Sequence, residues 1–187
     1  MKNILNGSIV RMITALTVVG VISGVFLVFV YNYSMPRIKI NISRETETSI
    51  KNIFPEADKI IPAAEKDVYT VEDSSGALLG YALLAEGNGY QGVIKLIVGV
   101  SPDLTRTHGM EVLDSQETPG LGAEIAGDNF RKQFQGLDIT RDIEYVKNQK
   151  PQKPYQIEAI TGATISSRAV VTIMNKRIDE VKKAMLK

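Results

Sequence analysis

The sequence contains no cysteine, and His108 is its single histidine. Without cysteine the chain can form no disulfide, no Cys-ligated zinc or iron–sulfur centre and no c-type haem attachment. A single histidine also argues against a His-rich metal site, so we predict no bound metal and expect His108 to be a surface residue. A strong charge of one sign is absent as well, because 22 basic and 21 acidic residues give a net charge of +1. The chain therefore has no electrostatic field for wrapping nucleic acid, and we expect no nucleic-acid partner.

Charged residues are missing from a long stretch near the N-terminus, between Met12 and Pro36. Its apolar part ends at Tyr33 and has 22 residues, and about 20 are needed to cross a bilayer. A cleaved signal peptide would have a shorter apolar core and a small-x-small cleavage site, which this stretch does not offer. The pattern favours a retained transmembrane anchor in contact with membrane lipid.

The basic residues flanking this anchor are nearly balanced, with two before it and three after it: Lys2, Arg11, Arg37, Lys39 and Arg44. The positive-inside rule therefore decides little. A short N-terminal tail ahead of a long C-terminal domain usually stays in the cytoplasm. We expect a single-pass protein of the cell (inner) membrane with its domain on the extracytoplasmic side.

The remainder alternates between helical and strand patterns. A juxtamembrane helix is expected to end before Pro55, and a final helix to run over 166–185 with one apolar stripe. Strands are predicted at 67–73, 77–86, 93–100, 108–114, 143–147 and 155–160, with a short helix at 126–134. The predicted class is α+β, with an antiparallel sheet packed against helices. The predicted organisation is a tail (1–11), an anchor (12–35), a juxtamembrane helix and domain start (36–75) and a main domain (76–187).

The segment GNGYQG, residues 87–92, matches the G-x-G-x-x-G pattern of dinucleotide-binding loops. Those loops need a helix directly after them, so that the pyrophosphate meets a helix N-terminus. A β-branched strand pattern follows here, so we reject dinucleotide binding and interpret the segment as a connection between strands. Tyr90 within it is either a residue that stacks on a ligand or an exposed turn tyrosine.

Two further loops are unusual. In QETPGLGAEI, residues 116–125, the pair Pro119-Gly120 suits a type II turn and Gly122 adds a second flexible point. Such a loop either lets backbone amides approach a ligand or merely connects a strand to a helix.

In EAITGATISSRAVV, residues 158–171, a strand gives way to the final helix. Free amides and the helix dipole at such a junction favour a phosphate. The alternative is that Thr164 or Ser166 caps the helix. A threonine hydroxyl without a base is a poor nucleophile, so no spontaneous chemistry is expected there.

Together these segments resemble the FMN-binding domain family: the flavin-attachment motif at 158–164, the loop ETPGLG and the segment GYQG occur in the family's order. With its anchor and length, the chain is similar to the G subunits of Rnf complexes, which move electrons between ferredoxin and NAD and translocate ions. The resemblance implies that Thr164 carries FMN as a phosphoester, attached by a separate flavin transferase from FAD with Mg²⁺. Glu158 stands where the family's motif has aspartate.

The resemblance also implies the other residues of the flavin site: Thr161, Gly162, Ala163, Glu117, Thr118, Gly120, Leu121, Gly122 and Tyr90. The expected partners are the other membrane and redox subunits of the complex, and no independent catalysis is expected. Three alternatives stay open. They are the C subunit of the sodium-pumping NADH:quinone oxidoreductase, an anchored module that binds a flavin or phosphate ligand reversibly, and a structural protein in which Thr164 is only a cap.

Overall fold

The computed structural model describes the backbone of residues 2–185 and the side chains of residues 7, 9–35 and 44–185. Contacts divide the chain into two compact units, one ending at Arg44 and the other beginning at Glu45. Helix α1 (Lys2–Ile53) passes through this division, so that its last turns belong to the second unit.

The first unit contains the helical segment Ile9–Met35, which is long and apolar enough to cross a membrane. The segment has 27 residues and a hydropathy of 2.6, and none of its most apolar window is buried within the protein. Phe26 and Phe29 expose 64% and 67% of their surface, which is unfavourable in water. Among residues 2–185, this segment is the one helix that is long and apolar enough to cross a membrane.

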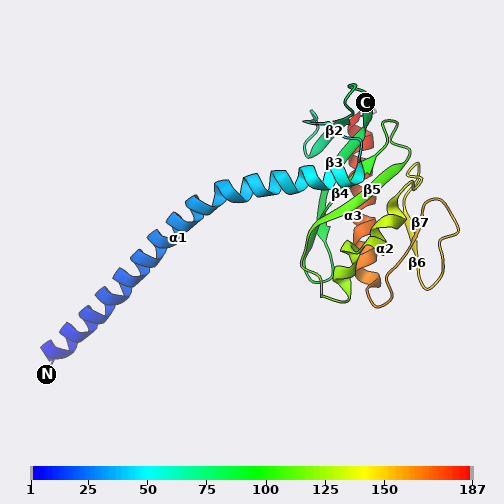
Figure 1. Cartoon of the computed structure of the whole chain (residues 1–187). Coiled ribbons are helices and arrows are strands. Elements are labelled where there is room, and N and C mark those ends of the chain that lie inside the picture. The colour runs from blue at the N-terminus through cyan, green and yellow to red at the C-terminus, as the bar shows by residue number, and fades with distance from the viewer. Residues whose placement is uncertain (1, 186–187) are drawn as a thin grey trace. The chain divides into compact units, whose positions relative to one another are not determined.

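The second unit is built on a five-stranded antiparallel sheet, teal to green in Figure 1. Each strand pairs with the next along the chain, in the order β1-β2-β3-β4-β5. The strands are β1 (Lys59–Pro62), β2 (Val68–Glu72), β3 (Leu78–Asn88), β4 (Val93–Val100) and β5 (Thr107–Ser115). The predicted hairpin and the two strands after it are confirmed. Strand β1 was not predicted, because its four residues end in proline and lack an alternating pattern.

Helix α3 (Thr164–Met185), orange to red in Figure 1, packs on one face of this sheet. Four residues of the predicted apolar stripe are buried, namely Val170, Met174, Ile178 and Val181, and the fifth, Met185, is partly buried. The other helical elements are short: η1 (Gly122–Ala126), α2 (Asp128–Arg131) and η2 (Lys132–Phe134). The short helix predicted at 126–134 is thus found as α2 followed by η2.

The end of α1 covers the opposite face of the sheet. Ile50, Ile53 and Phe54 form a buried cluster with three strand residues, Val71, Ala82 and Ile97. Gly99 of β4 lies so close that a Cβ built on it would stand 2.3 Å from Cγ2 of Ile53. The predicted juxtamembrane helix therefore ends before Pro55, as expected, and its last turns are part of the domain core.

Two more strands, β6 (Glu144–Val146) and β7 (Gln156–Glu158), form a separate parallel pair. Side-chain amides attach this pair to the helices. The amide group of Asn175 on α3 accepts a hydrogen bond from the Ile143 amide and donates one to its carbonyl, both at 2.9 Å. Gln133 of η2 binds the backbone of Glu158 in the same way, at 2.7 and 3.3 Å. These clamps complete the backbone hydrogen bonding of short segments that lie outside the main sheet.

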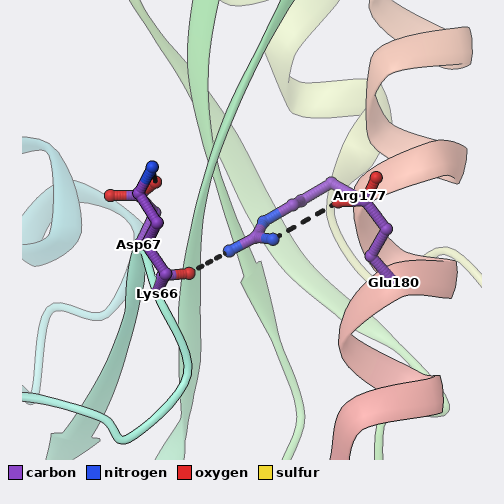
Figure 2. A network of polar contacts seen from close by, with 4 residues as sticks. All are labelled: Lys66, Asp67, Arg177 and Glu180. Carbon is purple, nitrogen blue, oxygen red and sulfur yellow. Dashed lines mark hydrogen bonds and ion pairs between the residues drawn. The ribbon is translucent and has the colours of Figure 1, made fainter.

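A polar contact also ties α3 to the start of β2 (Figure 2). The guanidinium of Arg177 donates to the backbone carbonyl of Lys66 and pairs with Glu180 at 3.4 Å. The next residue, Asp67, has a positive φ of 58°, and its carbonyl accepts a hydrogen bond from Leu84 at 2.9 Å. The helix is therefore fixed to the sheet by polar as well as apolar contacts.

Candidate functional site

The turn that joins β7 to α3 contains the TGAT segment. The amide of Ala163 donates to the carbonyl of Ile160 at 3.0 Å, which closes the turn. Gly162 has a φ of 84°, a backbone conformation that glycine adopts without strain. Thr161 and Gly162 are exposed and Ala163 is buried. The turn places Thr164 as the first residue of the 22-residue helix α3.

The hydroxyl groups of the first turn of α3 have different roles. Ser167 is fully buried; its Oγ donates to the carbonyl of Ala163 and accepts from the amide of Ile160, both at 3.0 Å. Ser166 is also buried, and its Oγ donates to Glu117 at 2.5 Å. Thr164 is partly exposed, and its hydroxyl has no hydrogen-bond partner in the part of the chain that the structure describes. Neither Thr164 nor Ser166 caps the helix.

The backbone amides of this first turn can bind an anion. Ser167 donates its amide to the carbonyl of Ala163 at 3.0 Å, whereas the amides of residues 164–166 have no acceptor among the described residues. Unpaired amides and the positive end of the helix dipole together attract an anion. A phosphate beside the Thr164 hydroxyl fits this arrangement.

The ETPGLG loop lies directly against the TGAT turn. Its turn is closed by the amide of Leu121, which donates to the carbonyl of Thr118 at 3.2 Å. Gly120 has a φ of 73°, as the predicted type II turn requires. A Cβ built on Gly162 would stand 3.3 Å from Cδ2 of Leu121, so the two segments are in van der Waals proximity.

Glu117, which we expected to lie against a flavin, is turned into the protein and exposes only 6% of its surface. Its Oε1 accepts hydrogen bonds from the amides of Tyr90 and Gln91, at 2.7 and 3.1 Å. Its Oε2 accepts the hydrogen bond from Ser166. Burial raises the pKa of Glu117, but the hydrogen bonds from Ser166 and the backbone amides outweigh burial, so the pKa lies below its usual value.

In the glycine-rich segment 87–92, the first two residues end β3 and the other four connect it to β4, with the amide of Gly89 donating to the carbonyl of Gly92 at 2.7 Å. A strand follows it directly, which agrees with rejecting the dinucleotide fingerprint. Tyr90 at its tip exposes 65% of its surface. Leu121 and Ile165, from the other two segments, expose 48% and 47%. Each of the three segments therefore presents one large apolar side chain to the exterior.

The remaining sequence candidates are less informative. His108 is exposed and its ring lies 4.7 Å from that of Phe54. Although the residue as a whole is exposed, partial desolvation of its ring lowers the pKa of His108. Asp128 does not cap a helix, since it pairs with Arg131 and Gly127 occupies the cap position. Histidine, aspartate and glutamate side chains of the described residues form no group of three that could hold a metal.

Comparison with known proteins identifies the family to which this chain belongs. The FMN-binding domain family model matches residues 89–179, a range that includes Tyr90, the ETPGLG loop and the TGAT turn. The G subunit of the ion-translocating oxidoreductase complex of Methanosarcina acetivorans is 32% identical over 183 residues, covering 92% of this chain and 94% of its own. The chain belongs to the family of G subunits of ion-translocating oxidoreductase complexes.

A second relative supports this assignment, and a solved structure supports the fold. The G subunit of the proton-translocating ferredoxin:NAD(+) oxidoreductase complex of Clostridium ljungdahlii is 31% identical over 174 residues, covering 89% of this chain and 88% of that relative. The crystal structure of NqrC from Shewanella oneidensis superposes with a TM-score of 0.57 and 23% identity, over 70% of this chain and 73% of that structure. The predicted α+β class is therefore confirmed.

Sequence reasoning missed several residues that organise this FMN-binding domain. It named Ser166 only as a possible cap and gave no role to Ser167 or Gln133. Each of these side chains has a hydrogen-bond partner that is distant in the sequence. Ser167 binds Ile160, which is 7 residues away, Gln133 binds Glu158, 25 residues away, and Ser166 binds Glu117, 49 residues away. The sequence shows only that some of these residues lie in or beside a motif. Such a position does not indicate whether a side chain points into the protein or toward solvent.

Proposed function

We propose that this chain is the electron-transfer subunit of an ion-translocating ferredoxin:NAD oxidoreductase complex and carries FMN as a phosphoester on Thr164. Its G-subunit relatives and its FMN-binding domain support the assignment to such a complex and the binding of FMN. The position of Thr164 is the observation that supports covalent attachment at this residue. Thr164 is partly exposed, and its hydroxyl is unpaired among the described residues, beside the free amides that begin α3.

The attachment is a phosphoryl transfer performed by a flavin transferase. The phosphoanhydride of FAD breaks, the FMN phosphorus bonds to Oγ1 of Thr164, AMP leaves and the hydroxyl proton is released. Such a partner supplies the Mg²⁺, for which the described residues form no group of three ligands, and a base, since no described side chain is hydrogen-bonded to the Thr164 hydroxyl. In the product, the amides of residues 164–166 would bind the phosphate oxygens. Thr164 is then an attachment point and takes no part in catalysis.

The flavin ring system is expected to lie over the exposed apolar side chains Tyr90, Leu121 and Ile165. An aromatic or aliphatic surface of this kind suits a flat, largely apolar ligand. Thr161, Gly162, Thr118 and Gly120 would border it, while Ala163 and Gly122 support the loops from inside. When bound, FMN supplies the redox chemistry, and the protein supplies attachment, orientation and local electric field.

The helical segment Ile9–Met35 would hold this carrier at the membrane, beside the other subunits of the complex. We place the FMN-binding domain on the extracytoplasmic side, since a short tail before a long domain usually stays in the cytoplasm. A covalent bond prevents loss of the cofactor there, where no cellular pool of FMN replaces it.

The test is the intact mass of the denatured full-length protein, produced in membranes together with a flavin transferase. We expect an FMN-sized increment in the wild type and in Thr164→Ser, which keeps a hydroxyl, and none in Thr164→Val. An increment that persists in Thr164→Val would place the bond elsewhere. No increment in any protein, with flavin released on denaturation, would favour the reversible binding module.

A further inference from the structure

The carboxylate of Glu117 is the point at which the three segments of the site meet. It binds the hairpin connection through the amides of Tyr90 and Gln91, and it binds the first turn of α3 through Ser166. Glu117 itself opens the ETPGLG loop. The Glu117–Ser166 bond spans 49 residues, and the bonds to Tyr90 and Gln91 span 27 and 26. One side chain of the ETPGLG loop is thus hydrogen-bonded to both of the other segments.

Glycines on two of these loops make room for this carboxylate. A Cβ on Gly89 would stand 2.2 Å from Oε1 of Glu117, and a Cβ on Gly122 would stand 2.5 Å from Oε2 and 2.7 Å from Oγ of Ser166. Real Cβ contacts are not that short. The absence of side chains at these positions therefore accommodates an internal carboxylate, whereas the glycine pattern alone suggested close approach of a ligand.

No lysine or arginine among the described residues forms an ion pair with Glu117. A buried carboxylate without a cation is stable only when hydrogen bonds satisfy it, and all three of these bonds come from the loops of the site. Its burial is therefore linked to the arrangement of these loops: moving any one of them removes a hydrogen bond from a buried charge.

We propose that Glu117 is the positioning residue of the flavin site, which holds the Tyr90 loop and the Thr164 turn in fixed relation and does not itself touch the flavin. One consequence is that flavin attachment at Thr164 depends on this connection, and this part of the proposal rests on the proposed function. The connection itself is a property of the flavin-free chain and can be measured without the cofactor.

The experiment compares Glu117→Ala, Glu117→Gln and Glu124→Ala in the full-length chain in detergent micelles. Glu124 is an exposed carboxylate of the adjoining η1 and serves as the matched control. Two quantities are measured: amide hydrogen exchange of the flavin-free proteins, and the initial rate of covalent flavin incorporation by a flavin transferase with FAD and Mg²⁺. Exchange at Leu83 and Ile97, in the central strands, reports whether each variant is folded.

We expect Glu117→Ala to accelerate exchange at Tyr90 and Gln91 about tenfold or more, because each amide loses a charge-assisted hydrogen bond, and to slow flavin incorporation about as much. Glu117→Gln keeps an oxygen acceptor for the same two amides. On a logarithmic scale, its exchange rates and its incorporation rate should therefore differ from those of the wild type by at most half as much as those of Glu117→Ala. Glu124→Ala should resemble the wild type. Should Glu117→Ala fail to fold, Ser166→Ala removes the α3 bond alone and should slow incorporation without changing exchange at Tyr90.

Two results would overturn the proposal. One is a folded Glu117→Ala variant in which exchange and incorporation both stay at wild-type rates. The other is a Glu117→Gln variant as defective as Glu117→Ala, since the carboxylate would then act through its charge and not through its connections. If the wild type acquires no covalent flavin at all, the proposed function fails, while the exchange measurements still decide whether Glu117 holds the loops together.

Discussion

The close approach of α1 to the sheet at Gly99 allows a double-mutant test of the packing on this face. A Cβ at Gly99 would stand 2.3 Å from Cγ2 of Ile53 and 2.8 Å from Cε2 of Phe54. Gly99→Ala should therefore overpack the interface and lower the free energy of unfolding by about 1–3 kcal/mol. Ile53 is 8% exposed, and Ile53→Ala alone should cost about 2–5 kcal/mol.

The double variant should be more stable than the sum of the two single changes indicates, because the new methyl group enters space that Ile53 leaves. The contact with Phe54 remains, so we expect only part of the overpacking to be relieved, giving a coupling energy of about 1–2 kcal/mol. Urea unfolding of the full-length chain in detergent micelles, followed by near-UV circular dichroism of its tyrosines, measures these differences.

A second pair serves as the control. Ile178 packs on the other face of the sheet, in the cluster with α3. Gly99→Ala combined with Ile178→Ala should be additive within about 0.5 kcal/mol, as for distant sites. If Gly99→Ala and Ile53→Ala prove equally additive, the end of α1 does not pack against β4 as described, and the reasoning is refuted.

Two further predictions concern single residues. Ser167→Ala should destabilise the domain by about 1–3 kcal/mol, because the part-buried amide of Ile160 and the fully buried position 167 both lose a hydrogen-bond partner. Urea unfolding measures this, and a change below about 0.5 kcal/mol would contradict it. The folded-state pKa of His108 is lowered by burial, so the unfolded chain binds its proton more readily and stability should fall as pH drops through the ordinary histidine value of about 6.5. His108→Gln should reduce the loss of stability between pH 7.5 and 5.5; an unchanged slope would mean that other groups cause it.

The elements of the main sheet could be predicted from local patterns. The β-branched run at 93–100 and the turn at 74–76 are short-range signals, and the structure places β4 and the β2–β3 hairpin there. The parallel pairing of β6 with β7 could not be predicted in this way. It depends on clamps by Gln133 and Asn175, whose partners lie 25 and 32 residues away.

The candidate site was predictable to a similar degree. Its three segments are recognisable as motifs, and the structure brings them together through Glu117 and Ser166. The direction in which Glu117 points was not predictable, because a glutamate in a glycine-rich loop is equally compatible with contacting a ligand. Its orientation is decided by the hydrogen-bond donors that the fold supplies and by the space at Gly89 and Gly122.

The internal carboxylate also bears on the order in which a working subunit is assembled. Glu117 satisfies the loop amides from inside the protein, so the loops need no external anion to acquire their shape. The amides of residues 164–166, in contrast, have no acceptor among the described residues, so they remain free to bind the phosphate of the proposed cofactor. Folding can therefore be completed before the cofactor is present, and a maturation enzyme would meet a finished acceptor surface with one free hydroxyl.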